Sequence, residues 1–199
     1  ARDDLDRNHN FLALAKSVEN IGTFGIAWMN AGVDDIDRYS AANVHEGSFD
    51  SSENAFLLSY GAVFDPVRLG GGVKILSQKI DPQLDDTDLG FGGLDIGVMA
   101  DPVEAVTVGL TIQNIFGKVA DASVPIQVRL GTALRLLPED NLLLAVDLDK
   151  AFVDLEDDTA VLHMGAEYIA AELVSFRLGV TSEKEFSAGL GINISDINI

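Results

Sequence analysis

The chain has 199 residues, enough for a domain with a sizeable core, and its 32 acidic against 13 basic side chains give a net charge of −19. This charge argues against a nucleic-acid-binding protein, because such proteins carry basic patches. The absence of Cys excludes disulfides, thiolate metal sites and cysteine nucleophiles. No apolar run reaches the ~18 residues of a transmembrane helix. The polar start is not that of a signal peptide, so we expect either a mature chain or a segment of a longer one.

Apolar and polar residues alternate with a period of two in successive segments, which predicts strands with one apolar and one polar face. In chain order, the alternating segments are 56–64, 67–75, 94–98, 106–113, 127–135, 142–149, 161–168, 174–180 and 186–193. Counted over the whole stretch from Phe11 to Ile194, which also includes the part before residue 56, the pattern predicts an all-β, antiparallel up-and-down arrangement of about eleven strands, with a twelfth starting at the last residues.

Short and long connections alternate along the chain. The short ones lie at Asp65-Pro66, at Asp101-Pro102, within 138–141 and at Ala170-Ala171. The other connections are mostly longer and acidic, and we expect the one over about 34–52 to be an extracellular loop. All short turns would then lie at one end of the sheet, and much of the acidic excess at the other.

Alternation alone does not say what the apolar face contacts. In a soluble sandwich or lipocalin-like barrel it forms the core, whereas in an outer-membrane barrel it contacts lipid. Strands of about ten residues favour the membrane, and so do the short turns at one end and long loops at the other. Isolated charges among Gly residues on the polar side also favour it. The sequence therefore predicts a transmembrane β-barrel, with residues 1–199 as a single domain.

The charged residues of the polar face are candidates for a functional site. We expect a lumen polar network of Lys74, Asp95, Arg129, Arg135, Asp147, Asp149, His163, Glu167 and Arg177. Acidic side chains on adjacent strands could serve acid–base chemistry. We favour an ion-pair network that stiffens or fills the lumen, because basic side chains lie on the neighbouring strands. We do not expect an enzyme, since no nucleophile, metal-ligand set or cofactor motif stands out.

Two acidic segments contain oxygen ligands of the kind that Ca²⁺ prefers. The weak candidate ligands are Asp85, Asp86, Asp88, Asp157 and Asp158. Neither segment has the spacing of an EF-hand loop with its closing Glu. We therefore favour solvated acidic loops, and we expect no cofactor.

Several segments together resemble the PorV/PorQ family of bacterial outer-membrane proteins, which are similar to long-chain fatty-acid transporter barrels. The segments are GTFGIAWMNAGVDDID, SENAFLLSYG, LGGGVKIL, GLDIGVMADP, VGLTIQNIFGK, VRLGTALRLL, LLLAVDLDK and HMGAEYIAAELVSFRLGV. The resemblance covers nearly the whole chain and implies a barrel of about fourteen strands in the outer membrane, so we expect a partial chain that lacks some terminal strands. It supplies no catalytic residue.

Some members of that family take part in type IX secretion. The resemblance thus implies a transport or protein-secretion role, with outer-membrane lipid and other secretion or surface-assembly proteins as partners. Two alternatives stay open: a structural outer-membrane anchor for a surface assembly, and a soluble β-barrel that binds an apolar ligand.

Overall fold

The described part of the chain is built from β-strands. The computed structural model describes residues 6–79, 87–119, 122–136, 141–152, 160–171, 173–194 and 197–198. In these ranges the strands are antiparallel and follow one another in an up-and-down order, as the alternation predicts. No helix long and apolar enough to cross a membrane occurs in these ranges.

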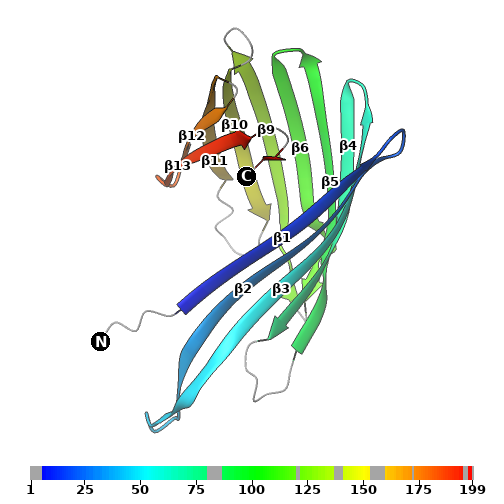
Figure 1. Cartoon of the computed structure of the whole chain (residues 1–199). Coiled ribbons are helices and arrows are strands. Elements are labelled where there is room, and N and C mark those ends of the chain that lie inside the picture. Colours follow the sequence, from blue (N-terminus) through cyan, green and yellow to red (C-terminus); the bar gives the residue numbers. More distant parts are fainter. Residues whose placement is uncertain are drawn as a thin grey trace. The chain divides into compact units, whose positions relative to one another are not determined.

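The strands join neighbours in the sequence almost throughout. They are β1 (Asp6–Val18), β2 (Gly22–Tyr39), β3 (His45–Phe64), β4 (Val67–Lys79), β5 (Thr87–Val103), β6 (Val106–Ile115), β7 (Lys118–Val119), β8 (Ala122–Ser123), β9 (Ile126–Leu136), β10 (Leu142–Phe152), β11 (Ala160–Ala170), β12 (Val174–Thr181), β13 (Phe186–Ile194) and β14 (Ile197–Asn198). The path of hydrogen-bonded neighbours runs from β1 to β6 and on from β9 to β14, while β7 pairs with β5 and β8. Figure 1 shows β1, β2 and β3 as long neighbouring ribbons.

The strands belong to two compact units, each assembled from separate stretches of the chain. The first unit comprises Ala1–Ala62, Gly70–Asp95 and Asn114–Val124, and the second comprises Val63–Leu69, Ile96–Gln113 and Pro125–Ile199. The first unit thus holds β1, β2 and most of β3, and the second holds β9 to β14.

The expected long loop over 34–52 is wrong in extent. β2 continues to Tyr39 and β3 begins at His45, so that only 40–44 joins them. The pairing of the two strands shifts between Val33 and Ile36 and again between Arg38 and Tyr39. These bulges break the period of two, and Asp, Ser and Asn are poor strand formers. The sequence therefore looks like a loop where the chain forms a hairpin.

In the second unit, the apolar side chains of six strands share one side. Residues directly opposite each other in antiparallel strands project from the same face of a sheet. One cross-strand row in this unit consists of Leu110, Leu130, Leu148 and Leu162. Another row pairs Met164 with Val180 and Val180 with Phe186. We call this side of the sheet the apolar face, and the other side the polar face.

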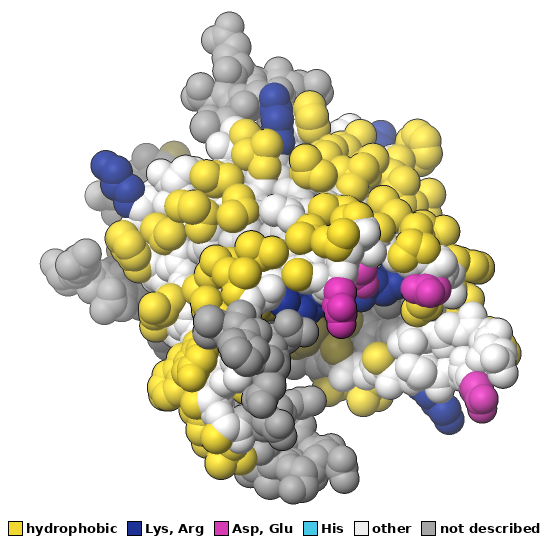
Figure 2. Space-filling view, turned by 90° about the horizontal axis from the view of Figure 1, so that it is seen from above, with side chains coloured by type: hydrophobic (Ala, Val, Ile, Leu, Met, Phe, Trp, Pro, Cys, Tyr) yellow, Lys and Arg dark blue, Asp and Glu magenta, His cyan; other side chains and the backbone are white. Residues whose placement is uncertain are grey.

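The first unit has the same division. Trp28 lies opposite both Leu12 and Phe56, and Ile26 lies opposite Leu14 and Leu58. These residues form its apolar face. Hydrophobic side chains spread over a large part of the surface that Figure 2 shows.

A row of asparagines ends the apolar face of the first unit. Asn10 Nδ2 donates to Asn30 Oδ1 at 3.2 Å, and Asn30 Nδ2 donates to Asn54 Oδ1 at the same distance. The indole Nε1 of Trp28 also donates to Asn54 Oδ1, at 3.1 Å. Beyond this row β2 and β3 continue as a polar hairpin that carries Asp34, Asp35, Asp37, Glu46 and Asp50.

The apolar face is largely exposed. Among the residues whose burial is described, no hydrophobic side chain is buried, and the buried polar residues are Thr107 and Asp149. Leu130 is 56% exposed and Leu190 is 74% exposed. A soluble chain of this length normally buries a hydrophobic core. In the described residues, therefore, no second layer of structure covers the apolar side chains of the sheet.

Candidate functional site

The polar face carries the charged residues that the sequence singles out. In the second unit, cross-strand partners place Arg129 opposite Asp149, Asp147 opposite His163, and Glu167 opposite Arg177. In the first unit, Lys74 lies beside Asp95. The structure arranges these residues mainly as separate local clusters.

An enclosed ion pair of the first unit joins Lys74 and Asp95. Lys74 Nζ lies 3.0 Å from Asp95 Oδ1, and the two side chains are only 13% and 19% exposed. Asp95 Oδ1 also accepts the backbone N–H of Asn114 at 2.9 Å, and Lys74 Nζ donates to Asn114 Oδ1. Asn114 has φ of 61°, in the left-handed region where Asn is tolerated. The cluster therefore fixes the backbone at the end of β6 as well as neutralising a charge.

Gly93 lies against the backbone of Asn114 in this cluster. Its φ is 111°, and an added Cβ would lie 2.6 Å from Asn114 Cα. Both the backbone conformation and the close approach require glycine. By contrast, a Cβ at Gly70 would find its nearest neighbour at 3.6 Å, with no unusual φ.

Gly93→Ala will destabilise the protein by about 2 kcal/mol, the scale of one strained backbone position. The measurement is an equilibrium urea titration of the refolded protein. Gly70→Ala is the matched control, which we expect to change the free energy of unfolding by less than about 1 kcal/mol. Equal effects of the two substitutions would contradict the requirement for glycine at Gly93.

Asp149 is the most buried charged residue among those described. It is 7% exposed, and its Oδ2 accepts hydrogen bonds from Arg129 Nε at 3.2 Å, from Arg129 Nη2 and from Gln127 Nε2 at 2.8 Å. A carboxylate that is almost completely enclosed needs such partners to remain in place. Since the guanidinium neutralises this carboxylate, the arrangement suits a structural ion pair better than a general base.

Glu167 and Arg177 form a more open pair on β11 and β12. The guanidinium donates from Nη2 to Glu167 Oε1 at 2.9 Å and from Nε to the same oxygen at 3.1 Å. Arg177 is 56% exposed and Glu167 is 24% exposed. Exposed pairs of this kind contribute little to stability. Their main effect is to place charge on the polar face.

Asp147 and His163 lie between these pairs in the second unit. The Asp147 carboxylate occupies the space that a Cβ at Gly131 would need, so glycine on β9 makes room for it. His163 is its cross-strand partner on β11. The two residues share the polar face with Asp149.

A further cluster near a short turn includes residues that the sequence interpretation missed. Arg68 Nη2 donates to both carboxylate oxygens of Asp101 at 2.7 Å, and Thr107 Oγ1 donates to Asp101 Oδ1 at 2.6 Å. Arg135, one of the expected residues, donates from Nη1 to Thr107 Oγ1 at 3.2 Å. Arg68 was identifiable, since it shares the parity of Lys74 on β4.

The proposed Ca²⁺ ligands fall mostly outside the described residues. Asp85, Asp86, Asp157 and Asp158 lie there, while Asp88 lies near the start of β5. In the described ranges, no group of three or more His, Cys, Asp or Glu side chains could hold a metal ion.

Comparisons with protein-family models and with curated proteins find no match to this chain.

Proposed function

We propose that the chain is an outer-membrane β-barrel protein of the PorV/PorQ type, with a role in transport or protein secretion. The observation that carries the proposal is the exposed apolar face. The described residues bury no hydrophobic side chain, and large side chains such as Leu178 and Leu190 are 67% and 74% exposed. Exposing so much apolar surface to water is costly, whereas lipid accepts it at no cost.

Strand lengths and connections support the same proposal. The strands β9, β10 and β11 have 11 residues each, close to the ~9–11 residues of a tilted bilayer crossing. The strands β2, β3 and β5 are longer than the expected ten residues, with 18, 20 and 17 residues, and would extend beyond the bilayer. The connections Asp65-Pro66 and Glu104-Ala105 are short, whereas the connections 80–86 and 153–159, at the opposite ends of their strands, are longer.

The polar face fits the inside of such a barrel. This face carries glycines and three ion pairs, which are Lys74–Asp95, Arg129–Asp149 and Arg177–Glu167. In the proposed barrel, these ion pairs would belong to the lumen polar network. The hairpin beyond the asparagine row of Asn10, Asn30 and Asn54 is acidic and projects past the apolar face. In this proposal, that hairpin and the acidic connections form the surface that meets secretion or surface-assembly partners.

A fractionation experiment tests the membrane location. The full gene is expressed, cell membranes are separated, and the protein is run on gels with and without heating. We expect it in the outer membrane, dependent on detergent and shifted in migration by heat. A soluble monomer without detergent would overturn the proposal and favour a soluble β-barrel.

Transport and anchoring differ in a second measurement. Flux through liposomes that contain the protein, or recovery of secreted cargo with it, is expected for a transport or secretion role. A protein that inserts but passes neither test would be a structural anchor for a surface assembly.

A further inference from the structure

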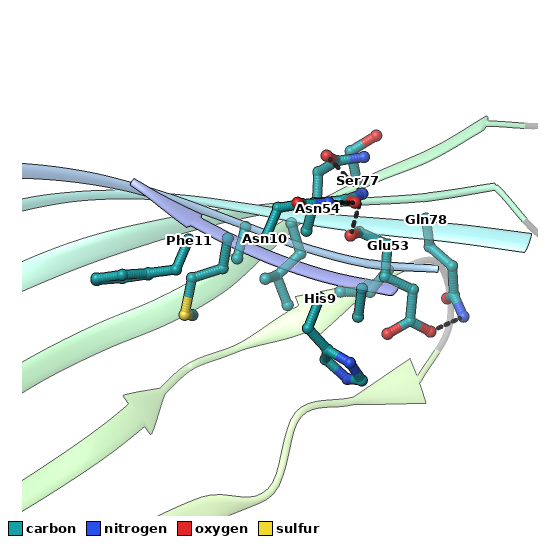
Figure 3. Close-up of a pocket in the computed structure, with 13 residues that line it drawn as sticks. His9, Asn10, Phe11, Glu53, Asn54, Ser77 and Gln78 are labelled. Atoms are coloured by element: carbon teal, nitrogen blue, oxygen red, sulfur yellow. Dashed lines mark hydrogen bonds between the residues drawn. The ribbon is translucent and has the colours of Figure 1, made fainter. Parts of the chain in front are cut away.

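A groove of about 500 Å³ lies within the first unit, over β1 to β4. It is built from the polar-face side of these strands, where Phe11, Met29 and Leu76 are large apolar side chains of the lining. Figure 3 shows Phe11, His9, Glu53 and Gln78 among the side chains that line the groove. Its volume falls within the ~300–1,000 Å³ that is typical of small-molecule sites.

The strand β7 supplies one wall of this groove through Val119. β7 pairs with β5, where Phe91 lies opposite Lys118. A Cβ at Gly90 would lie 2.5 Å from the Lys118 carbonyl oxygen and 2.6 Å from Val119 Cα. Only a glycine at this position lets β7 lie so close to β5. The chain thus uses glycine to bring an apolar side chain over the polar face.

Glu53 supplies the carboxylate among the described residues that line the groove, and the other polar lining residues are His9, Asn10, Asn30, Asn54, Ser77 and Gln78. Glu53 Oε1 accepts a hydrogen bond from Gln78 Nε2 at 2.8 Å, and Figure 3 shows Glu53, Gln78 and His9 projecting on the same side of the strands. Among the described residues that line the groove there is no Lys or Arg. A ligand carboxylate or phosphate would therefore meet the Glu53 carboxylate without a cationic Lys or Arg in this lining to offset the repulsion, whereas an ammonium group would find an acceptor.

We propose that this groove binds an amphipathic organic cation. The apolar body of the ligand lies against Phe11, Met29, Leu76 and Val119, and its ammonium group donates to the Glu53 carboxylate. The apolar lining favours an amphipathic ligand. The Glu53 carboxylate favours a cationic head group over the carboxylate of a fatty acid or the head group of another anionic amphiphile. The inference goes beyond the proposed function, because the groove lies within one unit and binding does not require transport.

The test is calorimetric titration of the folded, amphipol-bound protein with octylammonium and, separately, with octanoate. We expect octylammonium to bind and octanoate to bind at least tenfold more weakly. Glu53→Gln will weaken octylammonium binding at least tenfold, about 1.4 kcal/mol, because the charge-assisted hydrogen bond is lost. Glu183→Gln is the matched control, since this exposed carboxylate lies in a turn of the second unit, and we expect it to leave binding unchanged.

A third variant tests the apolar part of the groove. Ala55 lines the groove on β3, so Ala55→Trp will fill it and abolish octylammonium binding, provided that the variant keeps the β-sheet circular dichroism spectrum of the folded protein. Binding of octanoate as tight as that of octylammonium, or binding that Glu53→Gln leaves intact, would overturn the inference. Absence of octylammonium binding to the unmodified protein would also overturn it, whatever the outcome of the fractionation.

Discussion

Leu190→Arg will destabilise the protein in lipid by about 2–4 kcal/mol, the range for a cation at the lipid-facing midplane of a barrel. Leu190 lies at the middle of β13, on the apolar face, and is 74% exposed. In a water-soluble protein, a side chain exposed to that extent would tolerate the change within about 0.5 kcal/mol. Equilibrium urea unfolding from short-chain phospholipid vesicles measures the difference.

Ser187→Arg is the matched control for this substitution. Ser187 is on the same strand but on the polar face, opposite Gly179 on β12, where the missing side chain leaves room. We expect it to change the free energy of unfolding by less than about 1 kcal/mol. Costs of the same size on both faces would contradict the lipid-facing assignment of the apolar face.

Lys74→Met will cost about 3 kcal/mol of stability, since removing one partner of an enclosed ion pair leaves the other charge uncompensated. Lys74 and Asp95 are 13% and 19% exposed, so water cannot replace the lost ammonium group easily. In this variant the Asp95 carboxylate still accepts the hydrogen bond from the backbone N–H of Asn114, which limits the loss of stability. The same urea titration measures the change.

Two further variants give this prediction its controls. Arg177→Met removes the partner of Glu167 in an exposed pair and will cost less than about 1 kcal/mol. The double variant Lys74→Met with Asp95→Asn will recover part of the loss, because no uncompensated charge then remains. A double variant as unstable as Lys74→Met would show that the ammonium group acts through packing instead of charge.

The period of two was sufficient to predict which residues share a face. Regular alternation over 127–135 and 174–180 assigns each side chain of β9 and β12 to the side where the structure places it. The extension of β2 and β3 could not be predicted, because bulges after Val33 and Arg38 shift the parity of a segment that is also rich in poor strand formers. Local pattern predicts strands only where the pairing is regular.

The candidate site was predictable in part for a similar reason. Alternation placed Lys74, Arg129 and Glu167 on the polar face, but their grouping depends on the register between strands, which a single strand does not contain. Asp101 looks like a turn residue because Pro102 follows it, although it accepts from Arg68 and Thr107 in the structure. The groove escaped prediction because β7 returns over β5 within a segment that looks like a plain loop.

The lack of a buried hydrophobic core in the described residues bears on how such a sequence can change over time. In a close-packed interior, shortening an apolar side chain leaves a cavity that adds to the loss of transfer free energy. On the apolar face no such cavity forms where the surrounding medium is fluid, so Leu, Ile, Val and Phe should exchange there at small cost. The glycines beneath Asp147 and β7 have no such freedom. Selection should therefore require only an apolar residue at positions of the apolar face, but glycine itself at these two positions of the polar face.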